Sequence, residues 1–250
     1  MYWFVGLMVC ISLSGCIRYG DMAYMQDANY LEPYENYRIE DYKIKPFDNL
    51  VVKMNSFDGE LTDLINQDQT TIMLNDAKSA LYFNSYTVDD NGSIVLPLLG
   101  EVTVWHKSIA EIKAMLELML KDYVKYPTVN VKLSNYQVTV LGEVKDPGIK
   151  NYYDSKLTIF QALGLAKDLT PYGNRRQLKL IRETENGTVV VPIDLTNPNL
   201  MESDFYFLKP NDLIYVEPVK ARAFQLNKAN IELITGVFTF AILLYSTVNR

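Results

Sequence analysis

Hydrophobic side chains form one continuous run near each end of the 250-residue chain and recur at short periods between them. The first run covers residues 2–13 and stops just before Cys16. It is too short to span a bilayer comfortably, and it has the length of the apolar part of a signal peptide. We therefore predict a signal peptide over residues 1–15, with Cys16 as the first residue of the mature chain.

The residues around this cysteine predict lipidation. The run Leu13-Ser14-Gly15-Cys16 resembles a bacterial lipobox, after which the cysteine is acylated and becomes the new N-terminus. No Lys or Arg precedes the apolar run, but polar sequence begins directly after Cys16, which favours a signal peptide over an ordinary N-terminal helix. Ile17 rather than Asp follows, as in lipoproteins sorted to the outer membrane. Several acyl chains would anchor the protein stably where one would be marginal.

The second apolar run, residues 230–248, carries one charge near its start and as a helix would measure about 28 Å, close to the hydrocarbon thickness. Its polar residues recur at spacings of three, four or seven, which places a narrow polar seam on one helical face. The seam, interrupted at Ile242, comprises Glu232, Thr235, Thr239 and Ser246, flanked by Lys228 and Asn249. We predict a C-terminal transmembrane helix over 227–250, its seam facing the lumen of a ring. A single lipid anchor and a buried helix are the alternatives.

The sequence between the two runs predicts short strands, helices and turns. Residues 16–37 are polar and rich in tyrosine without clear periodicity, and they predict a tether. Asn91-Gly92 and Asn186-Gly187, each between two β-rich runs, predict two hairpins. Ser108 followed by Glu111 predicts a capping box at the start of a helix. A second, shorter helix is predicted over 157–165.

Two short sequences occur twice. Lys45-Pro46-Phe47-Asp48 returns as Lys209-Pro210-Asn211-Asp212, each time before an apolar strand. Leu99-Gly100-Glu101-Val102 returns as Leu141-Gly142-Glu143-Val144. Together they indicate two small mixed α+β modules that use similar turn chemistry and join near Asn135.

Composition narrows the possible functions. The formal net charge is −6 and no basic run is present, so the electrostatic footprint of a nucleic-acid-binding protein is missing. Both cysteines, Cys10 and Cys16, lie at the N-terminus, and His106 is the single histidine. The body therefore lacks the residues for a zinc site or a cysteine nucleophile. No G-x-S-x-G, H-E-x-x-H or phosphate loop occurs, and we expect no enzyme activity, no cofactor and no metal.

Three further groups of polar residues are candidate sites. Glu101 and Glu143 resemble a carboxylate pair for glycoside hydrolysis, but each lies in the same Gly-Glu-Val context and fits a solvated turn better. Arg175 and Arg176 form the single adjacent arginine pair. They are candidates for contact with a polymer or a partner subunit, and a solvated loop is the alternative. We expect His106 to be a surface or interface residue.

Longer motifs carry a resemblance to a known family. Tyr42-x-Ile44-x-Pro46-x-Asp48-x-Leu50, Gly92-x-Ile94-x-Leu96-Pro97-x-x-Gly100-x-Val102 and Tyr123-x-x-Tyr126-Pro127-x-Val129-x-Val131 resemble the polysaccharide export domain. Val138-x-Val140-x-Gly142-Glu143-Val144-x-x-Pro147-Gly148, followed by the 157–165 helix, resembles a soluble-ligand-binding β-grasp (SLBB) domain. The resemblance covers roughly residues 42 to 218 and becomes specific through the order of its motifs.

This resemblance implies an export domain over 38–135, a β-grasp-like SLBB domain over 136–220 and then the C-terminal amphipathic membrane helix. It implies a lipid-anchored outer-membrane protein whose main body is periplasmic and which forms a cyclic homo-oligomer. The expected partners are the polysaccharide, outer-membrane lipid and an inner-membrane chain-length regulator or tyrosine-kinase-type copolymerase. The expected function is that of a channel subunit for capsular or exopolysaccharide. The alternative is a periplasmic adaptor or scaffold lipoprotein that forms no pore.

The lipidation prediction can be tested directly. In cells fed a labelled fatty acid, Cys16→Ala should abolish labelling and release the protein from membranes, because the acylated side chain is gone. Cys10→Ala, within the predicted signal peptide, is the matched control and should leave labelling unchanged. Continued labelling of the Cys16 variant would show that the lipobox assignment is wrong.

Overall fold

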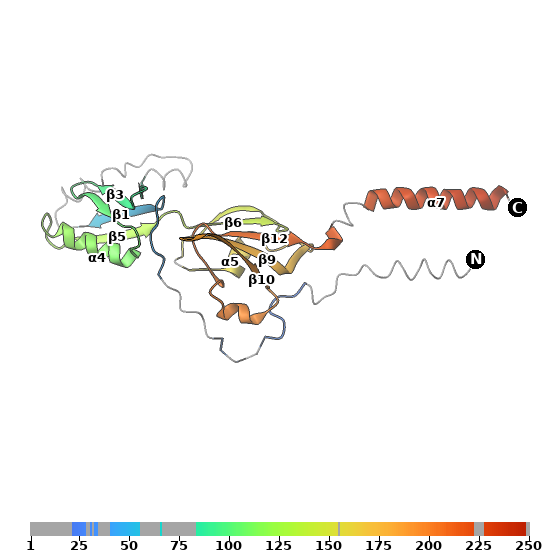
Figure 1. Ribbon diagram of the computed structural model, residues 1–250, viewed down its shortest axis with the longest axis horizontal. Coiled ribbons are helices and arrows are strands. Elements are labelled where there is room, and N and C mark those ends of the chain that lie inside the picture. Colours follow the sequence, from blue (N-terminus) through green and yellow to red (C-terminus); the bar gives the residue numbers. More distant parts are fainter. Residues whose placement is uncertain are drawn as a thin grey trace. The chain divides into compact units, whose positions relative to one another are not determined.

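The computed structural model describes residues 22–28, 31, 33–34, 41–55, 66, 84–154, 156–222 and 228–248, with side chains of the last stretch over 235–247 (Figure 1). The predicted signal peptide and Cys16 lie outside the described residues. The chain folds into two compact units. The first unit comprises Arg38–Gln137 with Asn151–Tyr153. The second unit is built from Val138–Lys150 and the chain from Asp154 onward, joined by the described part of the N-terminal segment.

The first unit is organised by a three-stranded antiparallel sheet. Its central strand β1 (Asn49–Asn55) lies between β2 (Tyr86–Thr87) and β5 (Thr128–Leu133). Alternate residues of β1 and β5 are buried opposite one another, in the pairs Leu50–Leu133, Val52–Val131 and Met54–Val129. This period of two is what a sheet with one face on the core requires.

Helix α4 (Ile109–Leu120) starts where the capping box was predicted. The Glu111 amide donates to Ser108 Oγ over 3.2 Å, and the Ser108 amide donates to Glu111 Oε2 over 2.6 Å. The helix buries Ile112, Leu116 and Leu120, one stripe at spacings of four. Hydrophobic burial along this stripe complements the sheet and completes the core of the first unit.

The prediction for Asn91-Gly92 is partly wrong. These residues form a turn, but β2 pairs with β1 rather than with the strand that follows the turn. The ladder joins β3 (Ser93–Leu96) to β4 (Gly100–Thr103), around the turn that contains Pro97. Gly92 has φ +79°, and a Cβ added there would lie 2.3 Å from Trp105 Cβ. The glycine therefore serves close packing of a loop and not a two-residue hairpin.

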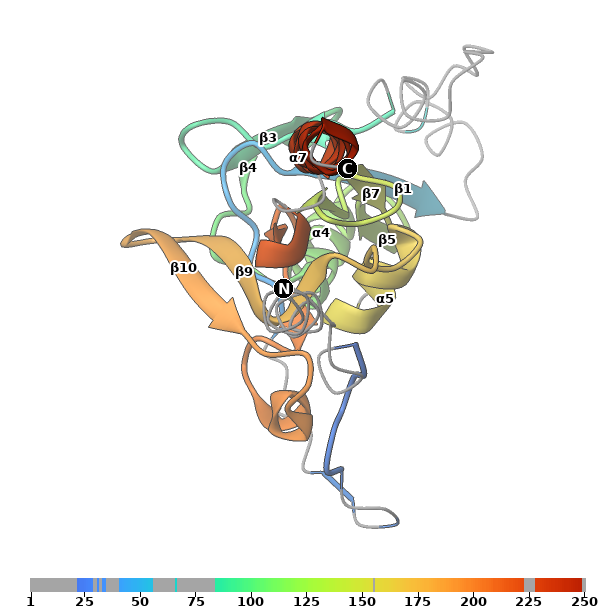
Figure 2. The same cartoon turned by 90° about the vertical axis from the view of Figure 1, so that its right-hand side faces the viewer.

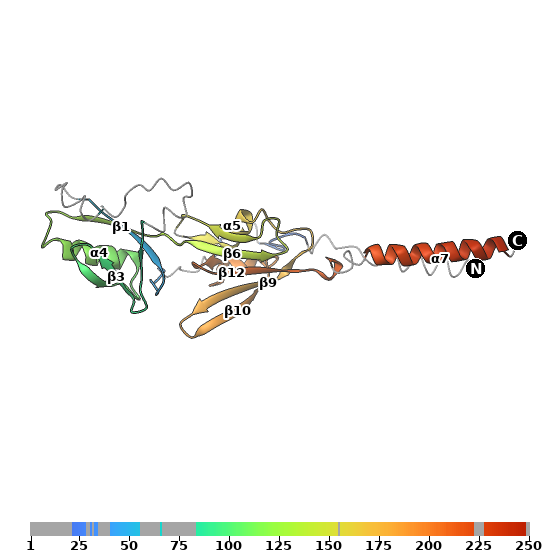
Figure 3. The ribbon, with the colours of Figure 1, turned by 90° about the horizontal axis from the view of Figure 1, so that it is seen from above.

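The second unit contains a five-stranded mixed sheet with the order β10-β9-β12-β6-β7. The strands are β6 (Gln137–Gly142), β7 (Gly148–Asn151), β9 (Gly173–Thr184), β10 (Gly187–Ile193) and β12 (Leu213–Pro218). The central pair, β12 and β6, is parallel, and the buried side chains of Val140, Ile214 and Leu180 lie in register across three strands. The predicted hairpin at Asn186-Gly187 is confirmed, and Figure 2 and Figure 3 show β9 and β10 as one long hairpin.

Shorter elements complete the second unit. A helix was predicted over 157–165. The structure has a two-residue strand, β8 (Leu157–Thr158), followed by helix α5 (Ile159–Leu165). β8 pairs with β11 (Phe207–Leu208), and a 3-10 helix covers Pro198–Glu202. Thr158 and Gln161 form a second capping box, which fixes where α5 starts. The two units are thus both mixed α+β, as predicted.

The C-terminal element is helix α7 (Lys228–Val248). Every side chain described in it, over 235–247, is exposed. Among the residues that the structure describes, no helix is both long and apolar enough to cross a membrane. The helix itself is confirmed, and a membrane crossing stays a prediction.

The repeated Leu-Gly-Glu-Val sequence places a glycine with positive φ in both units, +69° at Gly100 and +91° at Gly142. Their surroundings differ. A Cβ at Gly100 would meet nothing within 4 Å, whereas a Cβ at Gly142 would lie 2.1 Å from the carbonyl oxygen of Val216. At Gly142 the backbones of β6 and β12 approach so closely that a side chain has no room.

We therefore expect Gly142→Ala to destabilise the second unit strongly. Backbone strain of roughly 1–2 kcal/mol is joined by an overpacking cost of about 1–3 kcal/mol. Urea unfolding of the full chain measures the change in the free energy of unfolding. Gly187→Ala is the matched control, since Gly187 has φ +113° but nothing within 4 Å of an added Cβ. Equal losses in the two variants would contradict the close-approach argument.

Candidate functional site

Two buried aspartates close the same turn in the two units. The Lys45 amide donates to Asp48 Oδ2 over 2.9 Å, and the Asp48 amide donates to the Lys45 carbonyl over 3.2 Å. The corresponding bonds between Lys209 and Asp212 are 2.7 and 3.2 Å long. The third residue of each turn has positive φ, +69° at Phe47 and +68° at Asn211. The repeated Lys-Pro-x-Asp sequence is therefore a repeated structure, and it delivers the chain into β1 and β12.

Asp48 is buried among neutral partners. Its Oδ2 accepts from the Tyr42 hydroxyl over 2.9 Å, and its Oδ1 accepts from Asn135 Nδ2 over 3.3 Å. Burial raises the pKa of Asp48 above its usual range, although hydrogen bonds from Lys45, Tyr42 and Asn135 work in the opposite direction. Burial, reinforced by the neighbouring Asp48, raises the pKa of Tyr42 as well, so this hydroxyl remains a donor.

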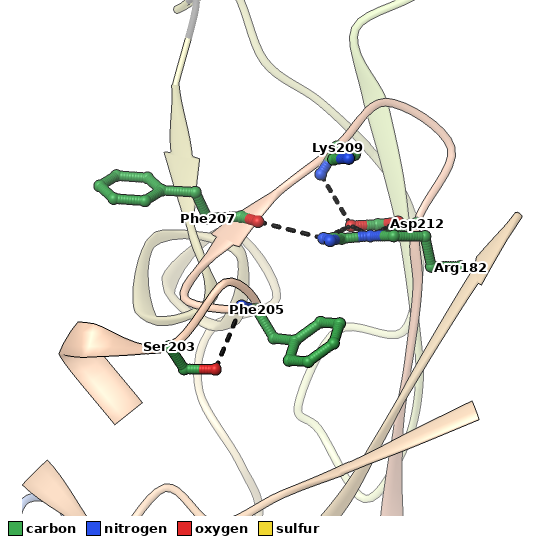
Figure 4. Close-up of polar contacts among 6 residues, drawn as sticks. All are labelled: Arg182, Ser203, Phe205, Phe207, Lys209 and Asp212. Atoms are coloured by element: carbon green, nitrogen blue, oxygen red, sulfur yellow. Dashed lines mark hydrogen bonds and ion pairs between the residues drawn. The ribbon is translucent and has the colours of Figure 1, made fainter. Parts of the chain in front are cut away.

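Asp212 is buried beside a cation instead (Figure 4). Arg182 Nη2 and Nε donate to Asp212 Oδ2 and Oδ1 over 2.7 and 3.0 Å, and Arg182 Nη2 also donates to the Phe207 carbonyl over 3.1 Å. The Phe205 ring lies 5.5 Å from the guanidinium carbon. Both charged side chains are at most 7% exposed. This pair is a structural ion pair inside the second unit, because no surface is left for a ligand to reach it.

The two candidate arginines of β9 have different environments. Arg175 is 6% exposed, whereas Arg176 is exposed, because successive residues of a strand point to opposite faces. Arg175 Nη1 donates to the Gly173 carbonyl over 3.2 Å. Arg175 is therefore too buried to contact a polymer or a partner subunit directly. Of the two arginines, Arg176 is the exposed one, and its contact with either stays a prediction.

Part of the predicted tether is bound to the second unit. The Tyr24 hydroxyl donates to Asp168 Oδ1, and its ring meets Phe160 edge-on with a centroid distance of 5.7 Å. The guanidinium of Arg175 lies over the same ring at 5.2 Å. Sequence reasoning missed this site, because one tyrosine in a tyrosine-rich segment without periodicity carries no signal for partners so far along the chain.

Glu101 and Glu143, identical in local sequence, also differ in structure. Glu101 is exposed on β4, as expected for a turn carboxylate. Glu143 is partly buried, with its side chain 18% exposed. Its Oε2 accepts from Thr170 Oγ1 over 2.6 Å, and its Oε1 accepts from Arg222 Nε over 3.1 Å. Arg222 lies over the Tyr172 ring at 5.2 Å. Glu143 is therefore not a free turn carboxylate, as was expected, but a partly exposed one that joins the end of β6 to the chain segment that precedes α7.

The predicted seam of α7 satisfies its hydroxyls internally. Thr239 Oγ1 donates to the Thr235 carbonyl over 2.8 Å, and Ser246 Oγ donates to the Leu243 carbonyl over 3.0 Å. Threonine and serine in helices often bond the preceding turn in this way. The side chain of Glu232 lies outside the described residues. The hydroxyls by themselves therefore do not require water, and the demand for a polar environment rests on Glu232.

His106 is exposed and stacks on Trp105, with ring centroids 4.5 Å apart and an angle of 20° between the ring planes. Across the described parts of the chain, no three His, Cys, Asp or Glu side chains gather in a way that would hold a metal ion.

Comparison with known proteins gives a match in the first unit. Residues 36–134 match the family described as "Polysaccharide biosynthesis/export protein". The chain is 30% identical over 113 residues to the EPS I polysaccharide export outer membrane protein EpsA of Ralstonia nicotianae, covering 44% of this chain and 30% of that protein. It is 30% identical over 142 residues to EpsA of Ralstonia solanacearum, covering 53% and 36%. The matched region spans about a third of the length of these curated relatives.

The raised pKa of Asp48 predicts a pH-dependent stability. The native state holds the proton more tightly than the unfolded state, so the contribution of Asp48 is fully present below the unfolded pKa of about 4. It is lost as the pH rises through the folded pKa. Asp48→Asn cannot ionise, so its stability deficit against the native sequence should be largest at acidic pH, about 1–3 kcal/mol, and should shrink as the pH rises.

Urea unfolding of the full chain over a series of pH values measures this difference. Asp90→Asn, which removes one negative charge at an exposed turn position, is the control for general charge effects. A deficit of Asp48→Asn that grows toward neutral pH would contradict the assignment.

Proposed function

We propose that this chain, whose residues 36–134 match the polysaccharide biosynthesis/export family, is one subunit of an outer-membrane channel for capsular or exopolysaccharide. Its curated relatives are named as outer membrane proteins of polysaccharide export, which supports an outer-membrane location and an export role. The role is transport, without catalysis: the polymer moves and no covalent bond in it changes.

Helix α7 is the observation that carries the channel proposal. All of its large apolar side chains between residues 237 and 245 are at least half exposed: Val237, Phe238, Phe240, Ile242, Leu243, Leu244 and Tyr245. A contiguous apolar surface of this kind marks an interaction with protein or membrane. A helix of 21 residues is about 30 Å long, which matches the hydrocarbon core of a bilayer. We infer that α7 inserts into the outer membrane together with α7 of other copies.

A ring of such helices would accommodate both the apolar side chains and the polar seam of α7. In a ring, each helix shows only part of its circumference to lipid, so the seam of Glu232, Thr235, Thr239 and Ser246 needs no lipid contact. An isolated helix would hold Glu232 against the acyl chains at considerable cost. Identical subunits that bind head to tail close into a ring or continue as a filament, and a pore requires closure. A cyclic homo-oligomer is therefore part of the proposal.

The topology of the second unit supports the β-grasp-like SLBB assignment. Its first two strands, β6 and β7, lie at one side of the sheet, a helix follows, and the last strand β12 returns parallel to β6 in the centre. This order, with the unit's first and last strands parallel and adjacent, is the β-grasp arrangement. We propose that this unit, with the export domain, forms the periplasmic body, anchored by lipid at Cys16.

The remaining elements of the proposal concern partners. A polymer made at the inner membrane must be handed to the outer-membrane ring, so we propose contact with an inner-membrane chain-length regulator or tyrosine-kinase-type copolymerase. Arg176, exposed on β9, is a candidate for contact with sugar carboxylates or a partner subunit. The competing function is a periplasmic adaptor whose α7 lines no pore.

Single cysteines test the channel directly, because the mature chain has no other thiol once Cys16 is acylated. In intact cells, cysteine in Thr239→Cys should react with a small water-soluble thiol reagent, whereas cysteine in Phe238→Cys should be protected by lipid. We expect a rate difference of at least about tenfold, since each unit by which an apolar environment raises the thiol pKa lowers the thiolate fraction tenfold.

The adaptor function predicts a different result. If α7 remains in the periplasm, the two cysteines should react at similar rates. An epitope tag placed after Arg250 would then bind antibody only after the outer membrane has been broken. Either outcome would reject the channel.

A further inference from the structure

We propose that residues 167–175 form a clamp that binds both membrane-directed ends of the chain, the N-terminal segment through Tyr24 and the root of α7 through Arg222. The loop joins α5 to β9 and reaches the first residues of β9. The assignment of both ends to the membrane rests on the proposed function, whereas the clamp itself rests on contacts within the second unit.

The N-terminal segment is bound by its backbone as well as by the Tyr24 side chain. The Met25 amide donates to the Leu195 carbonyl over 3.1 Å, and the Gln26 amide donates to the Thr196 carbonyl over 2.7 Å. Burial and the hydrogen bond to Asp168 raise the pKa of Tyr24, so the hydroxyl stays a donor at neutral pH. The Tyr24 side chain and the two backbone bonds that follow it thus fix the position of the segment.

The root of α7 is bound at the other side of the same loop. The Val219 amide donates to the Tyr172 carbonyl over 2.8 Å, and the Arg222 amide donates to the Val219 carbonyl over 2.9 Å. The Arg222 side chain is then held by Glu143 and by the Tyr172 ring. Arg222 is the last residue described before α7 begins at Lys228. The exit of the chain toward the helix is therefore fixed to the loop.

The loop is held by backbone contacts, so its binding site for Tyr24 cannot move freely without its binding site for Arg222. The Asp168 amide donates to the Leu163 carbonyl over 2.8 Å, and the Thr170 amide to the Glu143 carbonyl over 2.9 Å. Gly173 follows so closely that an added Cβ would lie 2.9 Å from the Glu143 carbonyl oxygen. Glu143 thus contacts the loop through its backbone and holds Arg222 through its side chain, which links the two binding sites.

Arg175 joins the N-terminal segment to the start of β9. Its guanidinium lies over the Tyr24 ring, and its Nη1 donates to the Gly173 carbonyl over 3.2 Å. Tyr24 therefore contacts the loop through Asp168 at one end and Arg175 at the other.

Chain length ties the clamp to the membrane. Tyr24 is the eighth residue after Cys16, and eight extended residues reach at most about 29 Å. A bound Tyr24 thus keeps the second unit within that distance of the acylated cysteine. The same loop also binds the residues that precede α7. The clamp would therefore connect both the lipid anchor and the helix to one rigid loop.

Hydrogen–deuterium exchange of the full-length protein in detergent tests the coupling. Tyr24→Phe removes only the hydroxyl, and exchange of the Met25 and Gln26 amides should rise about tenfold. Coupling predicts that exchange at Val219 and Arg222 rises too, by about two- to threefold. In the reciprocal variant, Arg222→Gln, the larger effect should fall on Val219 and the smaller on Met25 and Gln26. This reciprocity is required of any two coupled sites.

Tyr153→Phe, at a tyrosine that is 81% exposed, is the matched control and should change neither segment. Unchanged exchange in β9 and β12 shows that the fold is intact, and Asp168→Asn weakens the same bond from the acceptor side. If each variant affects only its own segment, or Tyr24→Phe changes nothing, the clamp is refuted. Neither outcome bears on the channel, which is tested by thiol labelling in cells.

Discussion

A buried carboxylate that closes the turn before a central strand is the interaction on which both units depend. Asp48 leads into β1, the middle strand of its sheet, and Asp212 leads into β12, the middle strand of the other. Backbone amides at such a turn would otherwise be buried without partners, at a cost of about 1–3 kcal/mol each. Because every other strand takes its register directly or indirectly from the middle one, an error in this turn would misplace the entire sheet.

The two units offset the cost of burying that carboxylate with different partners. Asp212 has the guanidinium of Arg182, which supplies charge and several donors at once. Asp48 accepts hydrogen bonds from the Lys45 amide, the Tyr42 hydroxyl and the Asn135 side-chain amide, and its pKa is raised because burial outweighs these bonds and the charge of Lys45. Removal of one partner of a buried ion pair leaves an uncompensated charge, so the second unit depends more strictly on both residues than the first depends on any single donor.

The second unit is where the N-terminal segment and the residues that precede α7 contact the same loop. Its loop between α5 and β9 contacts the N-terminal segment through Asp168 and the residues that lead to α7 through Tyr172. Within the part of the chain that the structure describes, the side chains of α7 over 235–247 are all exposed. In the proposed channel, assembly and membrane insertion would cover these exposed side chains.

The sequence by itself determined the features whose partners lie a few residues apart. The capping box at Ser108, the hairpin at Asn186-Gly187 and the Lys-Pro-x-Asp turns were predictable, because three or four residues fix each geometry locally. The family resemblance of the first unit rests on such local motifs in order. Only the tertiary structure decided the rest: the Asn91-Gly92 turn forms no hairpin, Glu143 differs from Glu101, and Tyr24 binds Asp168 across 144 positions. Periodicity and turn chemistry report which face of an element is apolar, but partners far apart in sequence are chosen by packing, which no local pattern contains.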